Sequence, residues 1–415
     1  MKSKLLYLYI LSLPFSFAFS FSSGTLTLAL MISIVMFAFL SIHFAVIKFA
    51  LSKKVVFYIL PSLIFCVYII FNFLITDSHL LTSFLHSTSY ISTVFLFFVI
   101  PVLYGYYFKN YINNKTIFLC IFIMVLYSSA YTVLQFISNN WFGINLDNYI
   151  YWPNVDVSNT MFLGNFYRAK GFAAEPGHYA FFLECFIPIV YYYLFVSEYS
   201  RLGRILKVSS FILIIISLLF TVSAAAFTII PAAIITALIF NYRLIFKLTK
   251  SFLIKAAVIV LLVSLVIFLL KDFLPIYDMV FTNSLDKSDS ADDRLYRLSL
   301  FKRLFSKADI FTAFFGYGPA VTAKLGLCKT CTIVLLYPLL IIELGVLGFL
   351  LFLRIFFQFF QKSKTLDKNF IFFFQISLFS LYFHYFLISN YWYPYIWFLG
   401  AMPYLLEKKS VESGI

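Results

Sequence analysis

The sequence has little of what marks a secreted or barrel-forming protein. Its five cysteines are too few and too scattered for a disulfide framework, and Cys66, Cys120 and Cys185 stand inside apolar runs as packing residues. Charged residues make up only 12% of the chain. The sequence also lacks the ~10-residue segments of alternating hydrophobicity that build a transmembrane barrel. These absences exclude a disulfide-rich secreted domain and a membrane barrel.

Apolar residues are what the sequence has in abundance. They make up 63% of the 415 residues, and the mean hydropathy is +0.96. A soluble domain is only about 45–50% apolar. Long apolar runs recur along the chain, each near the ~20 residues that a helix needs to cross ~30 Å of hydrocarbon. The sequence therefore predicts an all-α fold, a polytopic transmembrane helical bundle forming one integral membrane domain over residues 1–415.

The apolar runs predict about twelve crossings. The first run follows a basic N-terminus and also fits a signal peptide, but a second run follows at once, which favours an uncleaved hairpin of two spans. The run Val208–Phe240 has a small, polar middle, so we expect two crossings there with a tight turn near Ser223. A ninth span should end at Leu270. The other expected spans are Leu5–Phe19, Leu26–Ile47, Val55–Ile75, Ser89–Tyr107, Ile117–Ile137, Pro176–Val196, Thr332–Leu353, Phe370–Leu387 and Tyr391–Leu406.

The lysines and arginines indicate the orientation. Of 31 such residues, 20 fall in connections that would all lie on one side, and no short turn on the other side contains one. By the positive-inside rule the first side is the cytoplasm, which places both chain ends there. The net charge of +14 therefore reports orientation and argues against a nucleic-acid partner.

The remaining 11 cations all lie in two long loops, residues 138–175 and 271–331, which we expect on the outer face. Long loops escape the charge rule, so one interpretation is that both are ordinary solvated loops. The alternative is that the loops meet and form a basic cavity for an anion at the outer leaflet. Arginine suits such a site because its planar guanidinium grips a phosphate through two hydrogen bonds.

The densest polar chemistry stands at the end of the first long loop. Pro176 fits the first turn of a helix, which puts Glu175 at the N-cap, where the helix dipole keeps a carboxylate ionised. His178 and Tyr179 follow within one turn and are expected on the same face. Either Glu175 is catalytic, or it only caps the helix and pairs with Arg168.

The second long loop should contain a helix from Ala291 to about Lys307, because the residues before it resemble a capping box. One interpretation is a solvated or interfacial basic helix. The other is that Arg294 and Arg297 clamp a diphosphate. A glycine-led turn with Tyr317 follows. Further on, two thiols two residues apart favour a local disulfide over structural zinc, because no second pair is present; these are Cys328 and Cys331.

Three ionisable residues lie apart from these loops. His86 is expected as a surface histidine on a short outer turn. Glu184 is out of phase with Glu175 on the helical period, so it is expected protonated or paired inside the bundle, with no partner evident. Glu343 lies inside a span whose nearby glycines, Gly345 and Gly348, allow close helix packing.

The order of these motifs resembles one known family. The residues that carry the resemblance fit the RxxGxxxEPxxxA stretch of bacterial O-antigen polymerases of the Wzy type; they are Arg168, Gly171, Glu175, Pro176 and Ala180. Later stretches are similar to that family's second periplasmic loop and following span, namely Arg294, Phe315–Gly318 and Glu343–Gly348.

The same family group includes O-antigen ligases, and two positions bear on that choice. Ligases usually carry a histidine shortly before the span that corresponds to residues 332–353, and its absence here favours a polymerase. The group often has Ser-Arg between its seventh and eighth spans, where this chain has Ser223 and Ala224. An arginine role at that position is therefore not carried over.

The resemblance implies a glycosyltransferase at the periplasmic face of the bacterial inner membrane. It would transfer a growing glycan from undecaprenyl diphosphate to the sugar of a newly flipped lipid-linked repeat unit. The diphosphate bond supplies the driving force, so no cofactor, metal or nucleotide sugar is expected. The implied partners are the lipid-linked donor and acceptor and the membrane lipids, with room for a chain-length regulator protein. The alternatives are an O-antigen ligase and a lipid-linked oligosaccharide flippase or transporter, whose usual internal repeats the sequence lacks.

The resemblance and the chemistry together suggest roles for the loop residues. Glu175 would be the general base that accepts the proton of the acceptor hydroxyl. Arg168 and Arg294 would stabilise the departing diphosphate. The predicted substrate-binding residues are Lys170, Gly171, His178, Tyr179, Arg297 and Tyr317.

Overall fold

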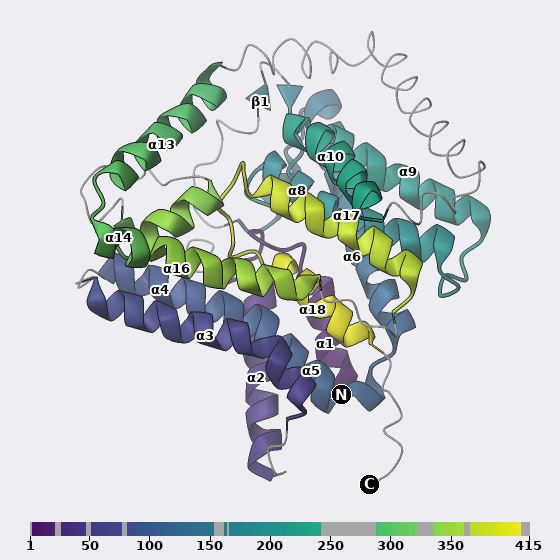
Figure 1. Cartoon of the computed structure of the whole chain (residues 1–415). Helices are drawn as coiled ribbons and strands as arrows, with labels where there is room; N and C mark the ends of the chain where they lie inside the picture. Colours follow the sequence, from purple (N-terminus) through teal and green to yellow (C-terminus); the bar gives the residue numbers. More distant parts are fainter. Residues whose placement is uncertain are drawn as a thin grey trace.

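The computed structural model of the chain describes residues 2–20, 26–46, 51–76, 81–152, 162–163, 166–241, 288–321, 335–360 and 366–407. These residues are mostly helical (Figure 1). The helices before the first long loop are α1 (Lys2–Ser12), α2 (Leu28–Val46), α3 (Lys53–Ile75), α4 (Leu81–Val94) with its continuation α5 (Ile100–Tyr107), and α6 (Asn114–Phe142). A π-helical turn, Phe95–Val99, joins α4 to α5.

The first long loop holds a short 3₁₀ turn (Leu146–Tyr149) and a two-stranded hairpin of β1 (Phe162–Leu163) and β2 (Phe166–Tyr167). The strands are antiparallel, with Phe162 opposite Tyr167. The later helices are α8 (Pro176–Tyr191) with its π-helical extension Tyr192–Val196, α9 (Arg204–Phe220), α10 (Ala224–Phe240), α13 (Ser288–Ser306), α14 (Ile310–Phe315), α16 (Leu336–Phe359), α17 (Lys368–His384) and α18 (Pro394–Leu406).

Six of the described helices are long and apolar enough to cross a membrane. They are Leu28–Ala45, Lys53–Ile75, Leu81–Tyr107, Asn114–Phe142, Pro176–Val196 and Leu336–Phe359. These helices agree with the predicted helical membrane bundle. The count of about twelve crossings stays a prediction, and its ninth span lies outside the described residues.

Two predicted boundaries can be compared directly with the structure. The turn expected near Ser223 is confirmed, because α9 ends at Phe220 and α10 begins at Ala224. The span expected to end at Ile137 continues as α6 to Phe142. Polar residues in this last turn do not end the helix, since their side chains bond back to carbonyl groups one turn earlier. Gly143, in the left-handed conformation with φ 66°, ends it.

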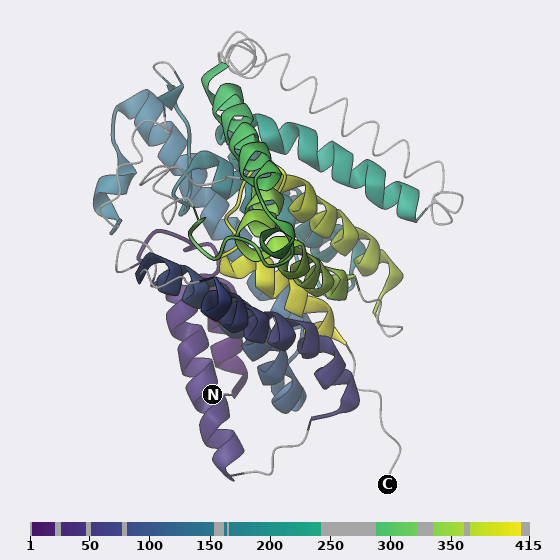
Figure 2. The same ribbon diagram turned by 60° about the vertical axis from the view of Figure 1, so that its left-hand side comes forward.

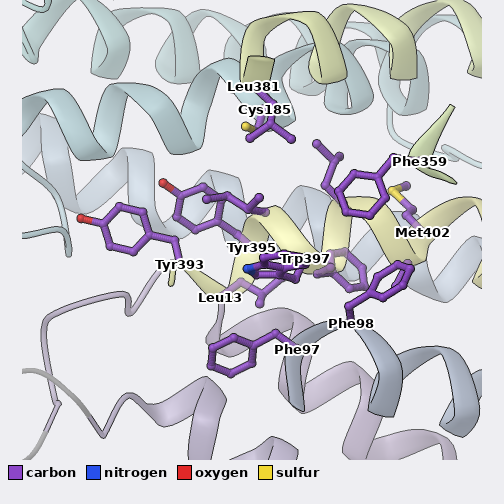
Figure 3. Packing of buried hydrophobic residues seen from close by; sticks show 14 of the residues in the cluster. Leu13, Phe97, Phe98, Cys185, Phe359, Leu381, Tyr393, Tyr395, Trp397 and Met402 are labelled. Atoms are coloured by element: carbon purple, nitrogen blue, oxygen red, sulfur yellow. The ribbon is translucent and has the colours of Figure 1, made fainter. Parts of the chain in front are cut away.

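Aromatic side chains build the core around α18. Every residue from Pro394 to Pro403 is buried, as expected for a helix surrounded by others on all sides. Figure 3 shows Tyr395 and Trp397 of α18 among residues from other helices, including Phe98 and Phe359. The core therefore fixes α18 and the connection that leads into it from α17.

Polar contacts join distant segments at both ends of the bundle. At the end where α8 begins, which we call the site end, the Ala18 amide donates to the Phe172 carbonyl at 3.1 Å, and Asn390 contacts His178. At the opposite end, Asn114 donates to the Leu406 carbonyl at 2.8 Å. In both views the N-terminus and α13 lie on opposite sides of the molecule (Figures 1 and 2).

Candidate active site

The segment before α8 is tied to the bundle through its backbone. The Tyr167 amide donates to the Asn140 side chain, and the Asn140 amide nitrogen donates to the Tyr167 carbonyl, both at 2.9 Å. Next along the chain, the Ala169 amide donates to the Phe220 carbonyl at 3.0 Å. The loop is therefore fastened to the last turn of α6 and to the end of α9, which fixes the residues that follow.

Gly171 makes the tightest part of this loop possible. Its φ of +56° is a left-handed conformation that glycine adopts without a Cβ penalty. A Cβ there would lie 2.7 Å from the Tyr179 ring and 2.8 Å from Thr132. Both Gly171 and Lys170 donate their amides to the Gln135 side-chain oxygen at 3.0 Å. The structure therefore explains Gly171 through packing on α6, and its predicted approach to substrate stays a prediction.

Arg168 lies at the turn between α9 and α10. Its Nε donates to the Thr221 carbonyl at 3.2 Å and its Nη2 to the Val222 carbonyl at 3.1 Å. A cation at this position meets carbonyls that the end of α9 leaves without helical partners. The guanidinium is thus fixed by two backbone groups at the site end while remaining half-buried.

Glu175 is the N-cap of α8, as predicted, but its carboxylate does not cap the helix. The residue is extended, with φ −136° and ψ 154°, and only its backbone carbonyl accepts the amides of His178 and Tyr179. No group in the described part of the chain donates a hydrogen bond to the half-buried carboxylate. The capping interpretation is therefore wrong for the side chain, which keeps its oxygens open.

Glu175 and Arg168 interact electrostatically. Burial raises the pKa of Glu175, and the Arg168 cation works against that rise. Burial also lowers the pKa of Arg168, with the Glu175 charge opposing it. The charges of Arg168 and Glu175 therefore influence each other, although no direct ion pair joins them in the described part of the chain. The predicted pairing is present only as this longer-range interaction, which favours the ionised carboxylate.

His178 and Tyr179 point to different neighbours. His178 Nε2 lies 3.2 Å from the Asn390 amide nitrogen, and its ring stands edge-on to Tyr393 with centroids 5.5 Å apart. Tyr179 is 1% exposed, and its hydroxyl donates to Ser128 of α6 at 3.3 Å. The three residues were expected on one face. Instead, Tyr179 contacts α6, whereas His178 contacts the α17–α18 connection. Substrate-binding roles for both residues stay predictions.

Lys170 is buried in an ion pair. It is 2% exposed, and its Nζ lies 3.2 Å from Asp147 Oδ2 and 3.6 Å from the centroid of the Trp152 ring. Burial lowers the pKa of Lys170, and Asp147 opposes the shift. The Asp147 carboxylate also accepts hydrogen bonds from Tyr131, Gln135 and Tyr167. The Lys170 charge is therefore satisfied inside the loop, although its predicted substrate contact is not tested.

We expect Lys170→Met to lower the stability of the folded protein by about 3–5 kcal/mol, because it leaves the buried Asp147 charge without its partner. The measurement is the thermal unfolding midpoint of the purified protein in detergent. Lys53→Met, at an exposed position, is the matched control. The double change Lys170→Met with Asp147→Asn should recover part of the loss. Equal midpoints for Lys170→Met and Lys53→Met would contradict a structural role for the pair.

In the second loop, α13 confirms the predicted helix, although it begins at Ser288. Arg294 and Arg297 lie one turn apart on it, and Arg297 is half-buried. The side chain of Arg294 lies outside the described part of the chain, as do Cys328 and Cys331. The Tyr317 hydroxyl donates to the Leu304 carbonyl of α13 at 2.9 Å. Whether these residues meet Arg168 over a ligand stays a prediction.

Two carboxylates inside helices have partners that the sequence did not reveal. Glu184 Oε2 lies 2.8 Å from Nδ1 of His384 on α17, and both residues are buried. Glu343 accepts a hydrogen bond from Tyr90 at 2.9 Å and lies 3.6 Å from His86 Nε2. His86, expected at the surface, is half-buried: its side chain is 25% exposed, and its ring stacks on that of Tyr90. An acidic residue inside a membrane span indicates that it has a buried partner, but only the folded structure shows which residue that partner is.

The chain matches no protein-family model and no curated protein. The resemblance to O-antigen polymerases therefore depends on the motif residues and their arrangement alone. Among the described residues, no group of three or more His, Cys, Asp or Glu side chains could hold a metal ion. The chemistry available at the site end is that of a carboxylate with open oxygens that interacts electrostatically with a fixed guanidinium.

Other residues of this site were not predicted from the sequence. Gln135, Asn140 and Asp147 hold the loop, and Asn390 approaches His178 from the α17–α18 connection. Gln135 lies near the end of its expected span and Asn140 three residues past that end, where polar residues are common, so no local signal marked them. Asn390 is distant in sequence from α8, and only the fold brings it there.

Proposed function

We propose that the chain is a polymerase of lipid-linked glycans, a metal-independent glycosyltransferase that joins repeat units carried on undecaprenyl diphosphate. The observation that carries the proposal is the electrostatic interaction of the Glu175 carboxylate with the Arg168 guanidinium at the site end. A charge near a membrane boundary is retained when it is used or paired. Here the guanidinium is held by two backbone carbonyls, while the carboxylate keeps its oxygens open.

The reaction needs one base and one anion stabiliser. The hydroxyl of the acceptor sugar attacks the anomeric carbon of the donor glycan, and the bond from that carbon to the diphosphate oxygen breaks. Glu175 takes the hydroxyl proton. Arg168 stabilises the negative charge that builds on the departing diphosphate. The products are a longer lipid-linked glycan and free undecaprenyl diphosphate, with the proton left on Glu175.

The arrangement of the bundle supports an outward-facing site. The helix ends that the charge pattern predicts outside meet at the site end, where α8 begins and the α9–α10 turn contacts Arg168. The ends predicted in the cytoplasm meet at the opposite end, where Lys54 pairs with Glu407. We propose a bacterial inner-membrane protein with both termini in the cytoplasm and the site at the periplasmic face. A chain-length regulator is a further partner to test.

Gene deletion tests the proposed function. We expect the deletion strain to lose its ladder of surface glycan on a gel and to retain a single repeat unit on the lipid anchor, because unit synthesis, export and attachment remain. Complete absence of repeat units would contradict the proposal and indicate a ligase or a flippase. A normal ladder would exclude all three functions.

Arg294→Ala should abolish polymer while the protein still accumulates in the membrane, because one preorganised group at a developing anion typically contributes about 10²–10³ in rate. Lys302→Ala, an exposed cation on the same helix, is the matched control and should keep the ladder. Both variants are compared by glycan gel and by immunoblot of membranes. Chains of normal length from Arg294→Ala would remove Arg294 from the site.

A further inference from the structure

Helix α16 is broken inside its apolar run. Gly345 has φ 69° and ψ 179°, which no helix accommodates. A break leaves the preceding carbonyl groups without intrahelical partners, and such groups are tolerated in a membrane span only where protein satisfies them. The Leu344 carbonyl accepts a hydrogen bond from the Tyr68 hydroxyl of α3 at 2.5 Å. The two carbonyls before it are satisfied by a separate segment.

That segment is the turn Gly316–Ala320, which follows α14. The Tyr317 amide donates to the Ile342 carbonyl at 2.8 Å, and the Gly318 amide donates to the Glu343 carbonyl at 3.0 Å. The turn is thus bonded to the break in α16 through main-chain groups.

Two glycines allow this approach. A Cβ on Gly316 would lie 2.3 Å from the Glu343 carbonyl oxygen, and a Cβ on Gly345 would lie 2.1 Å from the Phe314 carbonyl oxygen. Both glycines have positive φ, 81° and 69° respectively. Any side chain at either position would push the turn away from α16, so the contact requires glycine on both sides.

The Glu343 side chain also bonds to the turn. Its Oε1 accepts the Ala320 amide at 2.9 Å, and its Oε2 accepts the Tyr90 hydroxyl at 2.9 Å. His86 Nε2 lies 3.6 Å away, and the carboxylate is 2% exposed. One buried carboxylate therefore joins three elements: the turn, α16 and α4.

The same turn also holds α13. The Tyr317 hydroxyl donates to the Leu304 carbonyl, and a small separate core packs α13 and the turn against α16; its buried members are Leu300, Leu304, Val321, Leu339 and Ile342. Asn72 of α3 also donates to the Phe315 carbonyl at the end of α14. The placement of α13, which carries Arg294 and Arg297, therefore depends on the turn that Glu343 holds.

We propose that Glu343 is a positioning residue that fixes the second loop, and with it α13, against the broken helix α16. It acts by accepting the Ala320 amide and not by chemistry on substrate. Its effect on polymer rests on the proposed function, whereas its effect on the position of α13 does not. Glutamine keeps a carbonyl oxygen that can accept the same amide, so Glu343→Gln should preserve the placement and Glu343→Ala should not.

The test measures the position of α13 directly. Nitroxide labels at Ser299 on α13 and Thr88 on α4, both exposed, are placed in a background whose five cysteines are serine. The distance between them is measured by pulsed electron paramagnetic resonance in nanodiscs. We expect one narrow distribution for the parent and for Glu343→Gln, and a broadened or shifted one for Glu343→Ala. Gln358→Ala, at another buried polar residue of α16, is the control and should match the parent.

The same variants without labels are compared by glycan gel. Glu343→Ala should lose the ladder, and Glu343→Gln should keep it within several-fold of the parent intensity. An unchanged distribution for Glu343→Ala would overturn the proposal. So would a Glu343→Gln protein with the parent distribution and no ladder, because the charge would then act in the chemistry. If Glu343→Ala does not accumulate, Gly316→Ala tests the same contact from the turn and should give the same broadening. A parent without polymerase activity would leave the distance result standing and refute only the proposed function.

Discussion

Glu175→Gln should reduce polymer formation by about 10²–10⁴-fold at normal protein abundance, since an amide cannot accept the proton of the acceptor hydroxyl. The change is nearly isosteric, and the carboxylate makes no capping hydrogen bond that glutamine would lose. Folding should therefore be preserved. The measurement is the initial rate of polymer formation in membranes of known enzyme content.

The control for this variant is Glu198→Gln, the same change at an exposed acid just after the π-helical extension of α8. It should leave the rate unchanged. Retained activity in Glu175→Gln, within about tenfold of the parent, would reduce Glu175 to an N-cap residue and remove the general base from the mechanism.

The same assignment makes a prediction for pH. Burial raises the pKa of Glu175, and a general base works only when it is unprotonated. Activity should therefore fall as the pH drops through this raised pKa, at a higher pH than an exposed glutamate would give. Arg168→Gln removes the cation that opposes the rise, so the fall should move to still higher pH. The test is the rate profile of both proteins, and coincident profiles would contradict the coupling.

Arg168→Ala has the second large expected effect, a loss of about 10²–10³ in rate, because the departing diphosphate loses a preorganised cation. Arg168→Lys should recover little of it. Lysine keeps the charge but cannot donate from two nitrogens to the Thr221 and Val222 carbonyls, so its ammonium is not held in place.

Arg201→Ala, at an exposed arginine before α9, is the matched control and should keep the ladder. Membrane abundance and the thermal midpoint separate a catalytic loss from a folding defect, since Arg168 also satisfies the end of α9. An Arg168→Ala protein that accumulates normally and forms chains of normal length would remove this residue from diphosphate stabilisation.

The sequence predicted features that depend on local chemistry. Apolar run lengths placed the long helices, and the small, polar residues before Ala224 placed the turn between α9 and α10. Pro176 placed the start of α8 and so the N-cap Glu175. Each of these follows from residues within one or two turns of the feature. The orientation that the charge pattern predicts stays a prediction.

What the sequence could not predict depends on distant partners. Lys170 looks like a phosphate ligand in the sequence, but Asp147 meets it only after the first loop folds over α6. His86 looks like a surface residue, yet α4 brings it to Glu343 of α16. The glycines near Glu343 suggested close helix packing. Gly348 confirms it, because a Cβ there would lie 2.7 Å from the Tyr68 ring of α3, whereas Gly345 breaks the helix and admits a loop. Local sequence patterns therefore indicate the chemistry of such a side chain, but they do not indicate which distant residue it contacts.

A reconstituted reaction tests the proposed polymerase activity most directly. Lipid-linked repeat units extracted from the deletion strain are incubated with the purified protein in nanodiscs, without nucleotide sugar or added metal, and the products are analysed by mass spectrometry. We expect glycans of two or more repeats on undecaprenyl diphosphate, one undecaprenyl diphosphate released per bond formed, and no product with Glu175→Gln. Active substrate and folded protein that yield no joined repeats would contradict the proposed activity.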